Sequence, residues 1–216
     1  AAGAPRESLR QAVVTIGALL RVPHTAGIMA LALVTYASFV ALRGLWLGPA
    51  MMQRYGWSLV QAGNLAVAVS VVALASLPLF GRLDPGPRRR RAWMLGCTLT
   101  SAALFAAMAL HIGAWAEVAL MGLVCAVSGY GTLQYPDVKD AYEPAVIGRA
   151  MALFTMALFM GVALMQWATG ALASIAQAQG IDPFGPVFGS IAVLLVLGAF
   201  GFWWLPQPPT PPPAQR

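Results

Sequence analysis

The sequence predicts an all-α integral membrane protein, a bundle of six transmembrane helices, and three observations support this prediction. Hydrophobic residues make up 59% of the 216 residues and charged residues only 9%, whereas a soluble domain carries roughly 25% charged residues. The charged residues separate six uncharged intervals, each able to hold the ~20 residues that cross a bilayer core. No interval shows the two-residue alternation of a membrane strand, so each is expected to be a helix.

The intervals place the six helices, in chain order, near residues 25–46, 58–80, 92–112, 117–135, 150–174 and 185–205. Three of these helices carry stripes of small residues, which let membrane helices approach each other closely. The stripes are Ala62, Ala66 and Ser70; Gly96, Thr100, Ala103 and Ala107; and Ala157 with Gly161. They favour a compact bundle.

Two flanking segments differ from the membrane domain, which we expect to span residues 24–206. Residues 1–23 are predicted to form a cytoplasmic linker with an amphipathic helix whose apolar face holds Leu9, Val13, Ile16 and Leu20. This helix could lie along the inner membrane surface or be solvated. Residues 207–216 are rich in proline, so they are predicted to form an extended cytoplasmic tail.

The distribution of basic residues predicts the orientation of the bundle. Eleven of the 13 Lys and Arg residues lie at the two termini or in the connections on the same side as the termini, and only Arg43 and Arg54 lie toward the other side. Because basic connections remain in the cytoplasm, both termini are predicted to be cytoplasmic. We expect the protein to be integral to the plasma membrane, in bacteria the inner membrane.

Several function classes are disfavoured by the sequence. The net charge of +6 is not arranged with aromatic residues into a nucleic-acid surface, so no nucleic-acid partner is expected. His24 and His111 fall at opposite membrane boundaries, and Cys97 and Cys125 lie inside apolar runs without metal-ligand spacing. Since no hydrolase or metalloprotease motif is present either, we predict no enzyme activity, no cofactor and no metal site.

Three segments resemble the C-terminal half of a major facilitator superfamily transporter: Gly44–Tyr55 (GLWLGPAMMQRY), Gly81–Arg91 (GRLDPGPRRRR) and Pro144–Ala150 (PAVIGRA). The first is similar to the end of the seventh helix of that family, the second to its cytoplasmic loop motif and the third to the entry of its eleventh helix. The second segment departs from the usual pattern, because Gly81 precedes Asp84 by three residues rather than four.

The resemblance implies two six-helix halves, each built from two inverted three-helix repeats, with a substrate site near the midplane between the halves. It thereby implies a secondary transporter that moves a small-molecule substrate by alternating access. This chain would be one half, and the N-terminal six-helix half would come from a missing stretch or a partner chain. The alternative is a non-transporting six-helix membrane subunit or assembly factor.

The resemblance also implies a gating motif, formed by Gly81, Asp84, Gly86, Arg88, Arg89 and Arg149. In this interpretation Asp84 pairs with Arg149 or with the N-terminus of the fifth helix, where the helix dipole favours an anion. This contact would form in one conformational state and break in the other. The alternative is a solvated turn whose arginines only set topology and attract anionic lipid.

Candidate substrate-binding residues are the polar side chains inside the predicted spans. Arg43 could point into a cavity together with Tyr36, two turns away, and attract an anionic group, or it could snorkel to the outer boundary. Tyr130 and Gln134 on the fourth helix, and Gln166 on the fifth, could line the same cavity or hydrogen-bond a neighbouring helix.

Overall fold

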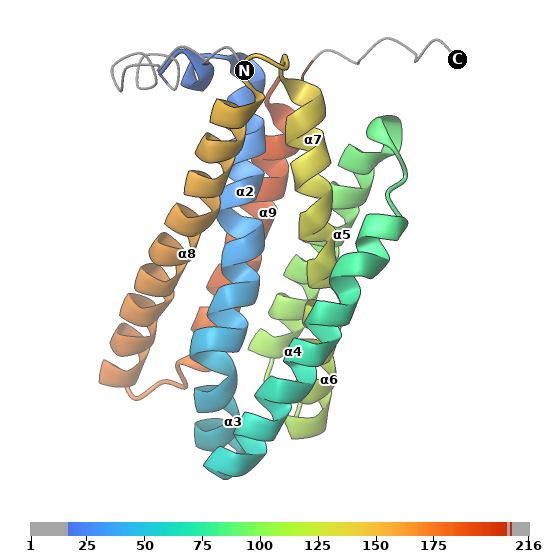
Figure 1. The fold of residues 1–216 in the computed structure, drawn as a ribbon. Helices are drawn as coiled ribbons and strands as arrows, with labels where there is room; N and C mark the ends of the chain where they lie inside the picture. Colours follow the sequence, from blue (N-terminus) through green and yellow to red (C-terminus); the bar gives the residue numbers. More distant parts are fainter. Residues whose placement is uncertain (1–16, 207, 209–216) are drawn as a thin grey trace, which may run out of the picture.

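The computed structural model describes residues 17–206 and residue 208, and six helices there are long and apolar enough to cross a membrane. No strand occurs in this part of the chain, so the predicted all-α, six-helix membrane fold is confirmed (Figure 1). The first three are Pro23–Tyr55 (α2 Pro23–Ala41, η1 Leu42–Trp46 and α3 Leu47–Tyr55), α4 Leu59–Arg82 and α5 Pro87–Ala109. The last three are Ala114–Ala141 (α6 Ala114–Val127, η2 Ser128–Leu133 and α7 Gln134–Ala141), α8 Ile147–Ala178 and α9 Phe184–Trp204.

Several helices extend beyond the ranges that the uncharged intervals predict. The first membrane helix continues past Trp46 to Tyr55 and therefore includes Arg54. The fourth continues to Ala141 and includes Asp137 and its charged neighbours. Charged side chains can occupy the last turns of membrane helices when they reach water or an opposite charge. A charge therefore marks the end of a membrane helix less sharply than we expected.

The helices pack in a pattern that repeats when the first three are exchanged for the last three. The first membrane helix packs through α2 against α8, and the fourth packs through α6 and η2 against α4. The third and sixth helices, α5 and α9, pack against each other, while α2 also contacts α9 and α6 also contacts α5. This is the pattern expected of two inverted three-helix repeats.

Glycines allow two of these helix pairs to approach closely. A methyl group added at Gly161 of α8 would overlap the backbone carbonyl of Leu33 on α2. One added at Gly129 of η2 would overlap the backbone of Ser76 on α4. Gly161 belongs to the small-residue stripe predicted on the fifth helix, and it lies where the two repeats meet.

The predicted linker and tail fall mostly outside the described residues. Leu9, Val13 and Ile16 of the amphipathic helix, and the tail except Pro208, lie there. Residues 17–20, which are described, are helical. Leu19 is buried in a core cluster that also contains Ile28 and Phe202, whereas Leu20 is 56% exposed.

Candidate functional site

A cavity of about 330 Å³ lies on the face formed by the first, second, fourth and fifth membrane helices. This volume falls in the ~300–1,000 Å³ range of small-molecule sites. Polar side chains from three of the four helices line it: Thr35, Tyr36, Arg43, Ser70, Ser128, Tyr130, Thr132, Gln134 and Tyr135. Apolar residues, among them Phe39 of α2, Leu74 of α4 and Leu158 of α8, complete the lining.

Two segments that depart from α-helical geometry contribute to the cavity wall. In η1, a π-helical turn, the N–H of Leu47 bonds the carbonyl of Leu42, five residues earlier, and this turn carries Arg43. In the fourth membrane helix, the 3₁₀ segment Ser128–Leu133 supplies several lining residues. Such irregular turns are frequent at functional sites because they redirect the side chains of the helix. Each belongs to the first helix of its repeat.

Arg43 lines the cavity without a carboxylate partner among the described residues. Its Nη1 donates to Ser70 Oγ at 3.3 Å, and its guanidinium lies 5.4 Å from the centre of the Phe39 ring. The five ion pairs of the described part of the chain are formed by Arg54, Arg90 and Arg91. The structure thus places a charged guanidinium at the cavity and leaves it without an opposite charge there.

The structure brings four of the five predicted substrate-binding residues to this cavity. Tyr36 is 41% exposed and packs edge-on against Phe159 of α8, with ring centres 6.0 Å apart. Arg43, Tyr130 and Gln134 also line the cavity, whereas Gln166 lies half-buried on α8 and is not among the lining residues.

Tyr130 and Gln134 line the cavity and also join helices, so the two roles considered for them coexist. The Tyr130 hydroxyl accepts a hydrogen bond from Thr98 Oγ1 of α5 at 2.9 Å. Gln134 Nε2 donates to Thr35 Oγ1 of α2 at 2.8 Å. The other amide atom, Gln134 Oε1, is buried and has no hydrogen-bond partner among the described residues.

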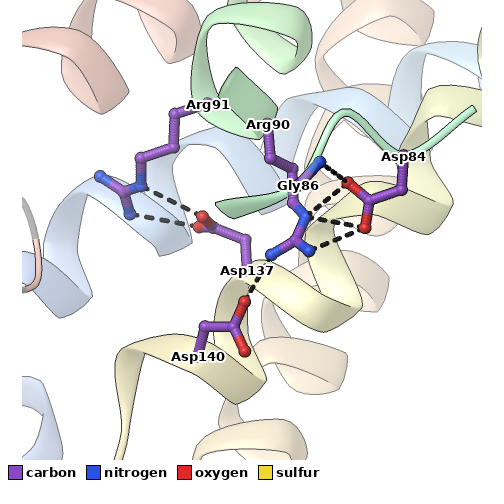
Figure 2. Close-up of polar contacts among 6 residues, drawn as sticks. All are labelled: Asp84, Gly86, Arg90, Arg91, Asp137 and Asp140. Carbon is purple, nitrogen blue, oxygen red and sulfur yellow. Dashed lines mark hydrogen bonds and ion pairs between the residues drawn. The ribbon is translucent and has the colours of Figure 1, made fainter. Parts of the chain in front are cut away.

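A second group of charged residues surrounds the connection between α4 and α5 (Figure 2). Asp84 accepts hydrogen bonds from the Gly86 N–H at 3.0 Å and from Arg90 Nη2 at 2.7 Å. Gly86 caps the start of α5 at a φ of 80°, which a residue with a side chain rarely adopts. The bonds from Arg90 and Gly86 hold the pKa of Asp84 below its ordinary value.

Arg90 joins this connection to the fourth membrane helix. Its Nη1 donates to Asp140 of α7 at 2.6 Å, so one buried guanidinium binds two carboxylates. Its neighbour Arg91 donates to Asp137 of α7 at 3.1 Å and covers the Phe202 ring of α9 at 4.5 Å. Figure 2 shows both arginines extending from α5 toward the aspartates.

The predicted gating residues are therefore only partly assembled in this conformation. Asp84 and Gly86 are in contact, but the ion pairs of the basic run are made by Arg90 and Arg91, while Arg88 and Arg89 are exposed. Gly81 lies in the last turn of α4 with open space around it. Arg149 lies half-buried in the first turn of α8, and the ion pair that the structure gives Asp84 is with Arg90.

A third cluster, which the sequence analysis missed, lies at the opposite end of the bundle. Arg54 of α3 pairs with Glu117 of α6 and, at 2.5 Å, with Asp182 of the α8–α9 connection. Its Nη1 also donates to the Met108 carbonyl at 3.2 Å, and its side chain is 2% exposed. Burial alone would raise the pKa of Asp182, but its bonds with Arg54 and the Gly185 N–H lower it.

Arg54, Glu117 and Asp182 are not among the site residues that the sequence predicts. The predicted topology nevertheless contained a signal for this ion-pair cluster. It places the end of the first helix, the start of the fourth and the connection after the fifth on the same side of the membrane. One arginine and two carboxylates at these three positions predict an ion-pair cluster.

Comparison with known protein families gives one match that covers these features. The model of the family described as Major Facilitator Superfamily matches residues 28–216, a range that contains both charged clusters and the cavity. Neither the comparison with curated proteins nor the comparison with solved structures gave a match. Because the family match extends over most of the chain and all six membrane helices, the chain belongs to the major facilitator superfamily, a family of membrane transporters.

Proposed function

We propose that this chain forms the C-terminal half of a secondary transporter that moves a small solute by alternating access. The observation that carries the proposal is the cavity on the face of the first, second, fourth and fifth helices. It combines polar side chains, a guanidinium without an ion pair and two irregular helical segments. Substrate sites of such transporters lie near the midplane between two halves and use interrupted helices.

The exposure of the cavity lining supports the requirement for a second half. Tyr36, Leu74, Leu77 and Tyr135 line the cavity and are between 41% and 67% exposed. A wall on the opposite side would bury them and exclude lipid and water. We propose that another six-helix half provides this wall, either on the same polypeptide or on a partner chain.

We propose that the protein is integral to the plasma membrane, which in bacteria is the inner membrane. Both termini then lie in the cytoplasm. The distribution of Lys and Arg supports it, with eleven of 13 on the side of the termini. The described chain ends and the α4–α5 connection lie at the same end of the bundle (Figure 1). Residues 1–23 and 207–216 are then a cytoplasmic linker and tail.

We further propose that the Asp84 cluster is a gate at the cytoplasmic end. Asp84 lies on a connection and its side chain is 26% exposed, so it can change partners more easily than a fully buried group. In a second conformation it would leave Arg90 for Arg149 or for the N-terminus of α8. Arg90 would keep Asp140 as a partner, which limits the cost of the exchange.

Transport by the complete protein tests the proposed function. The protein, expressed from its whole reading frame, is reconstituted into liposomes loaded with a defined mixture of metabolites, and the contents are followed by mass spectrometry. We expect at least one solute to leave faster than from protein-free liposomes. Leakage equal to that of protein-free liposomes for every solute would contradict transport and favour a non-transporting membrane subunit.

A further inference from the structure

We propose that the cavity binds an organic carboxylate with an apolar body, and that Arg43 recognises the carboxylate group. A hydrogen-bond donor at the far end of the molecule would bind Gln134. This inference rests on the proposed transport function, because it names the class of solute that the cavity accepts.

The charges around Arg43 support an anionic ligand. The described carboxylates lie at the two ends of the bundle: Asp84, Asp137, Asp140 and Glu143 at one end, Glu117 and Asp182 at the other. None of them lines the cavity, and Arg43 is the only charged residue that does within the described chain. A guanidinium inside a membrane span is unfavourable without an opposite charge. An anion in the cavity would supply the missing charge, whereas a cationic solute would be repelled.

The guanidinium of Arg43 has donors available for such an anion. Only Nη1 has a hydrogen-bond partner among the described residues, Ser70 Oγ at 3.3 Å. The remaining N–H groups form a planar fork that matches the two oxygens of a carboxylate. The guanidinium carbon also lies 5.4 Å from the centre of the Phe39 ring, a contact that uses none of these N–H donors.

Gln134 provides the second recognition point. Its Oε1 is a buried acceptor without a partner, while its Nε2 is held by Thr35 Oγ1 at 2.8 Å. A buried acceptor left unpaired is unfavourable, so a ligand hydroxyl or N–H there would be stabilised. Thr35 and Arg43 are eight residues apart on one helix, which corresponds to about 12 Å along its axis.

Much of the remaining lining of the cavity is aromatic or aliphatic. Tyr36 and Phe39 of α2, Leu74 and Leu77 of α4, and Tyr135 of α7 contribute to it. A ligand that spans from Arg43 to Gln134 therefore needs an apolar middle. The combination of one cationic end, an apolar wall and one acceptor describes an amphipathic hydroxy- or amino-substituted carboxylate.

Binding of three related probes to the purified complete protein tests this inference. 4-Phenylbutyrate carries the carboxylate, 4-phenylbutyramide is its neutral counterpart, and 4-(4-hydroxyphenyl)butyrate adds a donor at the far end. Affinities are measured by isothermal titration calorimetry for the wild type and for Arg43→Gln, Arg43→Lys and Gln134→Leu. Arg82→Gln is the matched control, since Arg82 is exposed in the last turn of α4 and does not line the cavity.

We expect 4-phenylbutyrate to bind about tenfold or more tightly than the amide, as a charge-assisted hydrogen bond predicts. Arg43→Gln should remove this difference, and Arg43→Lys should remove most of it because lysine lacks the planar fork. Arg82→Gln should bind like the wild type. The hydroxyl should improve affinity severalfold in the wild type and not in Gln134→Leu.

Equal affinity for the acid and the amide, including no binding of either, would overturn the inference. An acid preference that survives Arg43→Gln would overturn the role of Arg43. The proposed transport function fails independently: it is contradicted when no solute moves in liposomes, even if the acid binds. Flux confined to neutral or cationic solutes would keep the transporter and reject the carboxylate.

Discussion

Arg54 and Glu117, 63 residues apart in the chain, form an ion pair in which the two side chains are 2% and 0% exposed. The pair joins the end of the first membrane helix to the start of the fourth. Asp182, on the connection between the fifth and sixth helices, binds the same guanidinium from the other side. Arg54 thereby joins the first membrane helix, the fourth membrane helix and the connection between the fifth and sixth at this end of the bundle.

The opposite end repeats this arrangement with different residues. There Arg90 binds Asp84 from the connection between the second and third helices and Asp140 from the end of the fourth. In each cluster a buried arginine holds one carboxylate from a connection and another from an end of the fourth membrane helix. That helix is therefore anchored by an ion pair at both ends, while its middle lines the cavity.

Removing Arg54 is expected to destabilise the protein strongly. Arg54→Gln leaves Glu117 buried without its opposite charge, and breaking a buried pair in this way costs about 3–5 kcal/mol. The double variant Arg54→Gln with Glu117→Gln should recover part of the loss, because neither buried charge of that pair remains. Thermal unfolding in detergent measures the effect, with the exposed Arg82→Gln as control. A wild-type unfolding temperature for Arg54→Gln would contradict this prediction.

The close contact between α2 and α8 predicts different effects for two glycines on one helix. Gly161→Ala places a methyl group against the Leu33 carbonyl and should lower stability, because neither backbone can move without disturbing the helix pair. Gly170→Ala on the same helix meets open space and should be neutral or slightly stabilising, since alanine favours the helix. Unfolding temperatures compare the two. Equal effects of both changes would argue against a close approach at Gly161.

Asp84→Asn is expected to impair transport while leaving expression largely intact. The change removes the charge that the proposed gate exchanges between partners, and Arg90 retains Asp140 as an ion-pair partner. Solute flux in liposomes and the amount of purified protein measure the two effects. Arg82→Gln, which alters an exposed arginine in the last turn of α4 outside the proposed gating motif, is the control. Normal flux by a well-expressed Asp84→Asn protein would leave only the topological role of this segment.

The depressed pKa of Asp182 predicts a loss of stability at acidic pH. Its pKa in the folded protein lies below the ordinary value of 3.8. The contribution of ionised Asp182 is therefore complete above about pH 4 and is lost as the pH falls through the folded pKa. Unfolding temperatures measured from pH 7 to pH 3 should fall at the acidic end. The fall should be smaller in Asp182→Asn, and an identical pH profile for the two proteins would contradict the prediction.

Cysteine labelling tests the proposed orientation. In a background without Cys97 and Cys125, we expect Gln179→Cys to react with an impermeant maleimide in intact cells, because Gln179 is exposed directly after α8, at the end that the proposed orientation places outside. Lys139→Cys, exposed on α7 at the other end, should react only after permeabilisation. Labelling of Lys139→Cys but not Gln179→Cys in intact cells would reverse the orientation.

Hydropathy was sufficient to predict the helical fold and the number of membrane helices, because every backbone group in lipid must be paired within its own segment. The same method misplaced the helix ends. It treated Arg54 and Asp137 as boundaries, although an opposite charge on a neighbouring helix allows each to remain in a helical turn. Hydropathy considers one segment at a time and does not include such partners.

The candidate site was partly accessible from sequence for a related reason. Polar residues are rare inside apolar spans, so Arg43, Tyr130 and Gln134 stood out, and the structure places all three at the cavity. Gln166 stood out equally but is not among the lining residues. Which face of a helix points toward a cavity depends on how that helix packs against its neighbours, and α8 packs with Gly161 toward α2.

By itself, the sequence determined that this protein lies in a lipid bilayer, that it is helical, and which few polar side chains are available for a site. These properties depend on the local balance of apolar and charged residues. Only the tertiary structure decided that Asp84 pairs with Arg90, that Arg54 holds Glu117, and that Arg43 faces a cavity without a carboxylate. The physical reason is that ion pairs form over a few ångströms between helices far apart in the chain, so their partners depend on helix packing and rotation.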